Sequence, residues 1–154
     1  MNESVEFGLN RASEREIADL LRSCDADFIP PLSQRVQIDA YARKIIRHAE
    51  RFEAWVDGKL IGLVAAYCND PERRLAHITS VSVGREWTGR GIAGELMSRC
   101  MEHVRAAGMK EVTLEVAPEN AGAVRLYQRC GFVTGPGRAP FVTMRGSVPD
   151  LKTP

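Results

Sequence analysis

The sequence predicts one α/β (α+β) domain over residues 1–154, with about seven strands and about four helices in the order β-α-α-β-β-β-α-β-α-β-β. Three observations predict this class. Apolar residues alternate in some segments and recur every three or four positions in others, which are the periods of strands and helices. The Asp57-Gly58 pair between two β-like runs is a strong hairpin signal. No repeat or linker divides the 154 residues, which is the length of one ordinary domain.

The first half of the chain is predicted to fold around that hairpin. Ser13 and Glu16 form a capping box, which starts a helix because each side chain satisfies a free backbone N–H group. Two prolines in the segment CDADFIPPLSQRV (residues 24–36) interrupt the helical pattern and predict an irregular loop. The elements expected here are a strand over residues 5–9, a helix from Ser13 to Cys24, a helix over residues 38–49 and two strands within residues 51–68.

The second half alternates helices and strands. Gly108 and Gly131 each follow an apolar stripe with helical spacing, where a glycine typically ends a helix. The elements expected here are a strand over residues 76–83, a helix over 91–108, a strand over 110–117, a helix over 120–131 and two short strands within 132–146.

Composition limits the classes of partner. The chain has 21 Lys plus Arg and 20 Asp plus Glu, a net charge of +1, so it has no excess positive field for nucleic acid or anionic membranes. No apolar run approaches ~18 residues, and the first residues are charged throughout, which predicts a cytoplasmic protein. The four cysteines are widely spaced and no His lies at metal-ligand spacing, so we expect reduced thiols and no metal: Cys24, Cys68, Cys100 and Cys130.

The stretch GRGIAG, residues 89–94, matches the glycine pattern of dinucleotide-binding folds. In those folds the first strand runs almost directly into the first glycine, whereas GREWT separates Val83 from Gly89 here. Glu115 is a tempting match for the acid that follows such a motif, but too little chain remains after it for a doubly wound sheet. The glycines still predict an anion site, since a helix start presents free N–H groups and a positive dipole end.

Two longer stretches carry a family resemblance. VSVGREWTGRGIAGELM (residues 81–97) and LEVAPENAGAVRLYQRCGF (residues 114–132) are similar to the two core motifs of the GCN5-related N-acetyltransferases, the GNAT superfamily. The family pattern Q/R-x-x-G-x-G/A stands here with Thr88 in place of Gln or Arg and with Gly91 and Ala93 at the small positions. The resemblance implies a central mixed, mostly antiparallel sheet and acetyl-CoA as cosubstrate.

The resemblance also implies which residues hold coenzyme A. Backbone N–H groups from about residue 88 to 94 would bind its pyrophosphate, and the exposed backbone at Val81 and Val83 would pair with its pantetheine amides as an added strand does. Asn120 would contact the pantetheine arm or the phosphates, although Asn is also a preferred helix N-cap. The expected coenzyme residues are Val81, Val83, Thr88, Gly89, Arg90, Gly91, Ile92, Ala93, Gly94 and Asn120.

Acetyl transfer to an amine needs a base and an acid. An amine with a pKa of roughly 10.4 is the free base in about one part in two thousand at pH 7. The resemblance places Tyr127 as the acid that protonates the leaving thiolate, and we favour that role; without the resemblance, a tyrosine there would be read as packing between helix and sheet. Glu115 matches the base position of ribosomal-protein N-terminal acetyltransferases, and His77 that of histone-type members; we place Glu115 ahead of His77, with water-mediated deprotonation as a third route.

Acceptor recognition is expected in residues 24–36 and the following helix, because mobile loops on rigid scaffolds usually carry specificity. Asp25, Asp27 and Tyr41 are candidates for amine contacts and are also ordinary solvated or packing residues. The leading function is acetylation of a small-molecule amine or amino sugar. The alternatives are a protein or peptide N-acetyltransferase and a non-catalytic acyl-CoA-binding module. A homodimer is compatible with the sequence.

Overall fold

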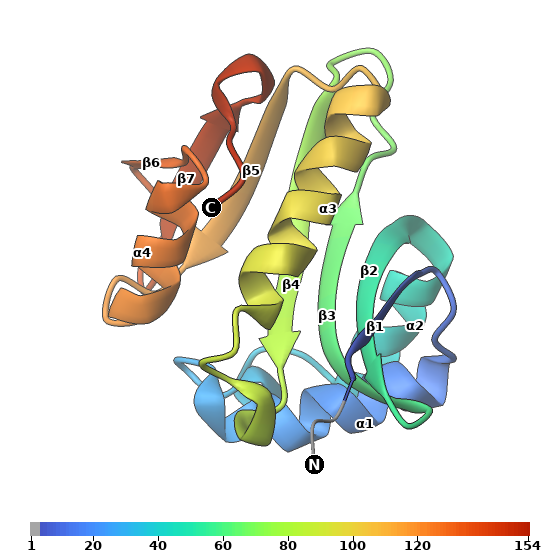
Figure 1. Ribbon diagram of the computed structural model, residues 1–154. Helices are drawn as coiled ribbons and strands as arrows, with labels where there is room; N and C mark the ends of the chain where they lie inside the picture. Colours follow the sequence, from blue (N-terminus) through green and yellow to red (C-terminus); the bar gives the residue numbers. More distant parts are fainter. Residues whose placement is uncertain (1–3) are drawn as a thin grey trace.

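The computed structural model describes residues 4–154, which form one seven-stranded sheet in the order β1-β2-β3-β4-β5-β7-β6 (Figure 1). Within this range β4 and β5 are the one parallel pair, and all other neighbours are antiparallel. The strands are β1 (Glu6–Leu9), β2 (Ala49–Val56), β3 (Lys59–Tyr67), β4 (Leu75–Val83), β5 (Glu111–Val116), β6 (Val133–Gly135) and β7 (Val142–Ser147). The mixed, mostly antiparallel sheet is as predicted, and it rules out a doubly wound dinucleotide fold.

Helices cover both faces of the sheet. They are α1 (Glu14–Cys24), α2 (Ile38–His48), α3 (Ile92–Ala106) and α4 (Ala121–Arg129), with 3-10 turns η1 (Asp25–Asp27), η2 (Leu32–Gln34), η3 (Arg85–Trp87) and η4 (Val148–Asp150). The helices α3 and α4 pack on one face over a core that includes Leu96, Val64 and Tyr127. The helices α1 and α2 pack on the other face over a second core that includes Ile17 and Leu63. The sheet is therefore buried on both sides.

Two local signals act as the sequence predicts. The Ser13 Oγ accepts from the Glu16 N–H at 3.1 Å, and the Glu16 carboxylate accepts from the Ser13 N–H at 2.9 Å, which completes the capping box of α1. Asp57 and Gly58 have φ of 49° and 76°, the left-handed pair that a two-residue hairpin requires between β2 and β3. One boundary is wrong: α2 ends at His48, and Ala49 already pairs with Tyr67 as the first residue of β2.

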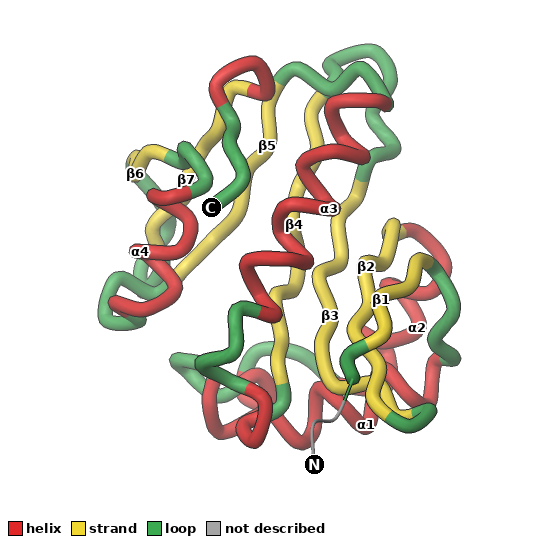
Figure 2. The backbone as a smooth tube through the Cα atoms, viewed as in Figure 1, coloured by secondary structure: helices red, strands yellow, loops and turns green. Residues whose placement is uncertain are grey.

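The strands β4 and β5 separate along their length, as the tube view makes plain (Figure 2). They pair over Leu75–Ile78 and Glu111–Leu114, after which β4 continues to Val83 without a partner on that side. The pairing of β4 with β3 shifts register at the same place, because Ala66 pairs with Ile78 while Ala65 pairs with Ser80. Thr79 is thus the extra residue of a β-bulge. The bulge and the separation open the middle of the sheet.

No helix within residues 4–154 is both long enough and apolar enough to cross a bilayer.

Candidate active site

Two cavities meet where β4 and β5 separate. The larger one, about 960 Å³, lies on the α3 and α4 face. The smaller one, about 250 Å³, lies on the α1 and α2 face and reaches the strand residues His77 and Glu115. The two cavities share five lining residues: Phe28, Val81, Asn120, Ala123 and Tyr127. The cavities therefore adjoin where the sheet opens.

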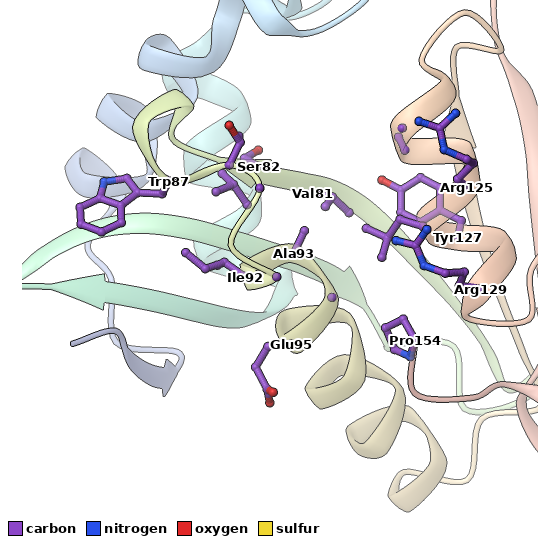
Figure 3. A pocket seen from close by; sticks show the side chains of 18 of the residues that line it. Val81, Ser82, Trp87, Ile92, Ala93, Glu95, Arg125, Tyr127, Arg129 and Pro154 are labelled. Atoms are coloured by element: carbon purple, nitrogen blue, oxygen red, sulfur yellow. The ribbon is translucent and has the colours of Figure 1, made fainter. Parts of the chain in front are cut away.

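The glycine loop before α3 forms one wall of the larger cavity (Figure 3). Gly89 and Gly91 both have φ of 78°, and Gly91 is the N-cap of α3. A Cβ built on either glycine meets nothing within 4 Å, so these positions need glycine for backbone conformation rather than for space. The loop presents the free N–H groups and positive dipole end of a 15-residue helix to the cavity, an arrangement that favours phosphate.

The larger cavity brings together most of the predicted coenzyme residues. Val81, Val83, Thr88, Gly89, Gly91, Ile92, Ala93, Gly94 and Asn120 all line it. Arg90 does not line it: its guanidinium stacks over Trp87 at 4.6 Å and donates to the Glu86 carbonyl at 3.3 Å. The Arg90 side chain therefore packs against a residue of the cavity wall and does not itself line the cavity. The Asn120 side chain caps α4 by accepting from the Ala123 N–H at 3.3 Å.

Two arginines of the larger cavity were not predicted from the sequence. Arg125 and Arg129 extend from α4 beside Tyr127 and line the wall opposite the glycine loop (Figure 3). Both are exposed, and neither forms an ion pair within residues 4–154. Their spacing of four residues places them on one side of a helix, which is a signal that the sequence does contain. They add positive charge to a cavity already suited to an anion.

Tyr127 stands at the junction of the two cavities. Its ring is 6 % exposed and packs edge-on against Phe132 at 6.3 Å between ring centroids. The hydroxyl points from α4 toward β4 (Figure 3) and forms no hydrogen bond within residues 4–154. Burial raises the pKa of Tyr127 well above its ordinary value, so the hydroxyl stays protonated at physiological pH. It is a proton donor that the fold leaves unused.

The smaller cavity contains both candidate bases. His77 on β4 and Glu115 on β5 line it, and the His77 Nδ1 lies 2.9 Å from the Thr113 Oγ1. Burial lowers the pKa of His77, an effect that Lys44 reinforces and the nearby Glu115 carboxylate opposes. His77 is therefore a neutral imidazole at pH 7 and can accept a proton. Glu115 lines the same cavity and is exposed to solvent.

The three acceptor-side candidates have different positions. Asp25 lines neither cavity; its carboxylate accepts from the Ser33 N–H and Oγ, each at 2.7 Å, and fixes the loop between α1 and α2. Asp27 lines the larger cavity instead and pairs with Arg85 at 2.7 Å. Tyr41 lines the smaller cavity, but its hydroxyl donates to the Thr79 carbonyl at 2.6 Å, so it stabilises the bulge of β4.

Metal-ligand clusters are absent from the described residues: no three His, Cys, Asp or Glu side chains there could hold an ion. All four cysteines are free. Burial raises the pKa of Cys68 and Cys130 to about 11 each, which keeps both as thiols at neutral pH.

Comparison with known sequences places the chain in a family. The sequence model of the acetyltransferase (GNAT) family matches residues 15–132. An uncharacterized N-acetyltransferase of Methanocaldococcus jannaschii is 36% identical over 85 residues, 53% of this chain and 38% of that protein. The N-alpha-acetyltransferase MAK3 of Arabidopsis thaliana is 36% identical over 83 residues, 53% of this chain and 44% of that protein. These matches span less than half of the relatives' own length.

A third relative is named for mycothiol. The mycothiol acetyltransferase of Streptomyces coelicolor is 31% identical over 103 residues, 67% of this chain and 33% of that protein. Among solved structures, an N-acetyltransferase of Thermoplasma acidophilum in complex with coenzyme A shares the fold, with a TM-score of 0.71 at 15% identity over 94% of this chain and 99% of that one. The family match over residues 15–132, together with a seven-stranded sheet that opens between β4 and β5, shows that the chain belongs to the GNAT family of acetyltransferases.

Proposed function

We propose that the protein is an acetyl-CoA-dependent N-acetyltransferase that moves the acetyl group directly to a primary amine of a small molecule or amino sugar. One observation carries the proposal: two cavities on opposite faces of the sheet meet beside Tyr127. Direct transfer requires both substrates to be bound at once with their reacting atoms in contact. Adjoining cavities would allow this, because each substrate would enter from its own side of the sheet.

The larger cavity suits coenzyme A in shape and charge. The N–H groups of residues 88–94 at the start of α3 would bind the pyrophosphate, and Arg125 and Arg129 add positive charge across the cavity. Val81 and Val83 lie beyond the part of β4 that pairs with β5, so their outward N–H and C=O groups would pair with the pantetheine amides, as a sheet edge does with an added strand. Within residues 4–154 the Val83 carbonyl accepts only from the Cys24 thiol, at 3.5 Å. Acetyl-CoA would supply an activated thioester, and the residues of this cavity would hold that thioester in position.

The smaller cavity supports amine deprotonation. An acceptor amine arrives mostly as the ammonium ion, so a proton must leave before attack. Glu115 and His77 line the same cavity on neighbouring strands. We retain Glu115 as the first candidate for the base and His77 as the second. A pH profile of kcat/KM for Glu115→Gln and His77→Gln separates them, because only loss of the true base removes the acidic limb.

Tyr127 completes the chemistry at the junction. When the amine attacks, the acetyl oxygen gains negative charge, which a fixed N–H donor on the β4 edge at Val81 can stabilise. The tetrahedral intermediate then breaks its C–S bond and releases the thiolate of coenzyme A. The Tyr127 hydroxyl, protonated and free of any partner within residues 4–154, would give that thiolate its proton and then take up the proton that the product nitrogen must lose.

A polypeptide N-terminus is the second candidate acceptor. Its support is the named N-alpha-acetyltransferase relative and the apolar rim of the smaller cavity, where Ile29 is 44% exposed. The cavity volume of about 250 Å³ is slightly below the usual range for ligand sites and would suit a small amine or the end of a chain.

The test is thiol release from acetyl-CoA across a panel of small amines, amino sugars and short peptides. Turnover with small amines supports the leading proposal, and turnover confined to peptides supports the second. Tight binding of coenzyme A without turnover on any acceptor would identify a non-catalytic acyl-CoA-binding module instead. Isothermal titration with coenzyme A, measured on the same preparation, distinguishes that module from a misfolded sample.

A further inference from the structure

Arg35 is a charged residue of the smaller cavity with no part in the chemistry above. It caps η2 in the connection between α1 and α2 and lines the cavity. Its guanidinium lies over the Phe141 ring at 4.3 Å from the centroid. Phe141 precedes β7 and also lines the cavity, so the pair joins two loops that are far apart in the sequence. Stacking on an aromatic face holds a guanidinium in place and leaves its N–H donors free.

The charge of Arg35 is not neutralised by the protein. Within residues 4–154 it takes part in no ion pair or side-chain hydrogen bond, unlike the neighbouring Arg22 and Arg43, which pair with acidic residues. Burial raises the pKa of Tyr41, another lining residue, to about 12, and the positive charge of Arg35 opposes that rise. Arg35 lines the cavity and is also exposed to solvent.

Glu115 supplies the opposite charge of the same cavity. It too forms no ion pair in the described part of the chain, and it does not pair with Arg35. His77 is neutral at pH 7 because burial lowers its pKa. The lining residues with a full charge at neutral pH are thus one cation, Arg35, and one anion, Glu115, and they belong to different elements of the fold.

We propose that the acceptor is an amine that also carries a carboxylate, with Glu115 attracting the ammonium group and Arg35 binding the carboxylate. This inference rests on the proposed function and names its substrate class. A guanidinium presents paired donors that match the two oxygens of a carboxylate. Two unpaired charges of opposite sign on the walls of a small cavity are complementary to a zwitterion, whereas a plain amine would leave Arg35 to lose solvation without gaining a partner.

The test compares acceptors that differ only in whether they carry a carboxylate or the corresponding amide. The wild-type protein is assayed with acetyl-CoA, ω-amino acids of two to six carbons, and the amides of the same acids. We expect kcat/KM to favour the best acid over its amide by roughly 10- to 150-fold, the range for a hydrogen bond to a charged group. A second arm uses short peptides whose first residue ends in a carboxylate or in the matching amide, which tests whether the carboxylate comes from a small molecule or a chain end.

Variants at Arg35 assign the preference to this side chain. Arg35→Met retains packing over Phe141 and removes the charge, so the acid-over-amide preference should fall toward one while kcat/KM for the amide stays within about threefold. Arg35→Glu should favour diamines over amino acids. The matched control is Arg138→Met. Arg138 lies in the connection between β6 and β7, which also contains Phe141; its side chain is exposed and lines neither cavity. It should keep the wild-type preference.

The outcomes separate the two proposals. If no amine or peptide is acetylated, the proposed function fails. If amines are acetylated and the wild type treats acids and amides alike, or Arg35→Met keeps the wild-type preference, the carboxylate inference is overturned and the function stands. The wild-type ratio needs no variant, so poor folding of Arg35→Met would leave the inference testable. The preference should also weaken with added salt, since Arg35 is exposed.

Discussion

Replacing Tyr127 by phenylalanine removes a single hydroxyl at the junction of the two cavities. The ring would keep its burial and its edge contact with Phe132, and no hydrogen bond within residues 4–154 would be broken. We therefore expect the free energy of unfolding to change by less than about 0.5 kcal/mol and Tm by less than about 2 °C. Loss of a general acid lowers turnover about 10²- to 10⁴-fold, or about 3 to 5 kcal/mol in the barrier.

The assay measures kcat by thiol release and the Kd of coenzyme A by calorimetry. We expect Tyr127→Phe to lower kcat in that range and to leave the Kd within about twofold, because the hydroxyl acts on the leaving thiolate. Tyr67→Phe is the matched control, since Tyr67 lines neither cavity; it should retain wild-type turnover. Unchanged turnover in Tyr127→Phe would remove the hydroxyl from the mechanism. An equal loss in both variants would show that the effect is structural.

Three further predictions concern the loop, the pH dependence and the fold. Gly91→Ala places a Cβ on a residue with φ of 78°, so we expect it to destabilise the fold by about 1 kcal/mol. Calorimetry should also show at least fivefold weaker binding of coenzyme A. The control is Gly108→Ala, at φ of 77° beyond the other end of α3, which should destabilise the fold without weakening that binding. Folding lowers the pKa of His77, so the unfolded chain binds more protons near pH 6 and the free energy of unfolding falls on acidification. Urea denaturation should show that this free energy falls less between pH 6.5 and 5 in His77→Asn than in the wild type. An equal fall in both proteins would contradict this prediction. Glu53 is fully buried and accepts from three N–H groups, the shortest at 2.8 Å, so Glu53→Ala should lower the urea unfolding free energy by about 3 to 5 kcal/mol, and a change below about 1 kcal/mol would refute its structural role.

The element order could be predicted because local signals and tertiary packing agree. The capping box at Ser13, the left-handed pair at the β2–β3 turn and the glycine after α3 each fix one boundary by backbone chemistry. The end of α2 could not be predicted so closely. Ala49 has helical spacing relative to Ile45, yet its pairing with Tyr67 in the sheet outweighs that local preference.

The site could be predicted where its function depends on backbone, and less well where it depends on side-chain direction. The glycine loop follows from sequence because a left-handed residue before a helix needs glycine. The direction of Arg90, the positions of Asp25 and Asp27, and the stacking of Arg35 on Phe141 depend on contacts between elements distant in the chain. Those contacts leave no periodic signal in a single sequence.

The bulge at Thr79 connects the fold to the chemistry. In an unbroken strand, His77 and Val81 would face the same side of the sheet because side chains alternate with a period of two. The extra residue reverses the alternation, so Ile78 and Val81 both pack on the α3 side while His77 faces the smaller cavity. The Tyr41 hydroxyl holds the bulge by donating to the Thr79 carbonyl at 2.6 Å. One inserted residue therefore turns one part of β4 toward the larger cavity and another part toward the smaller one, and removing it would place His77 on the same face as Val81.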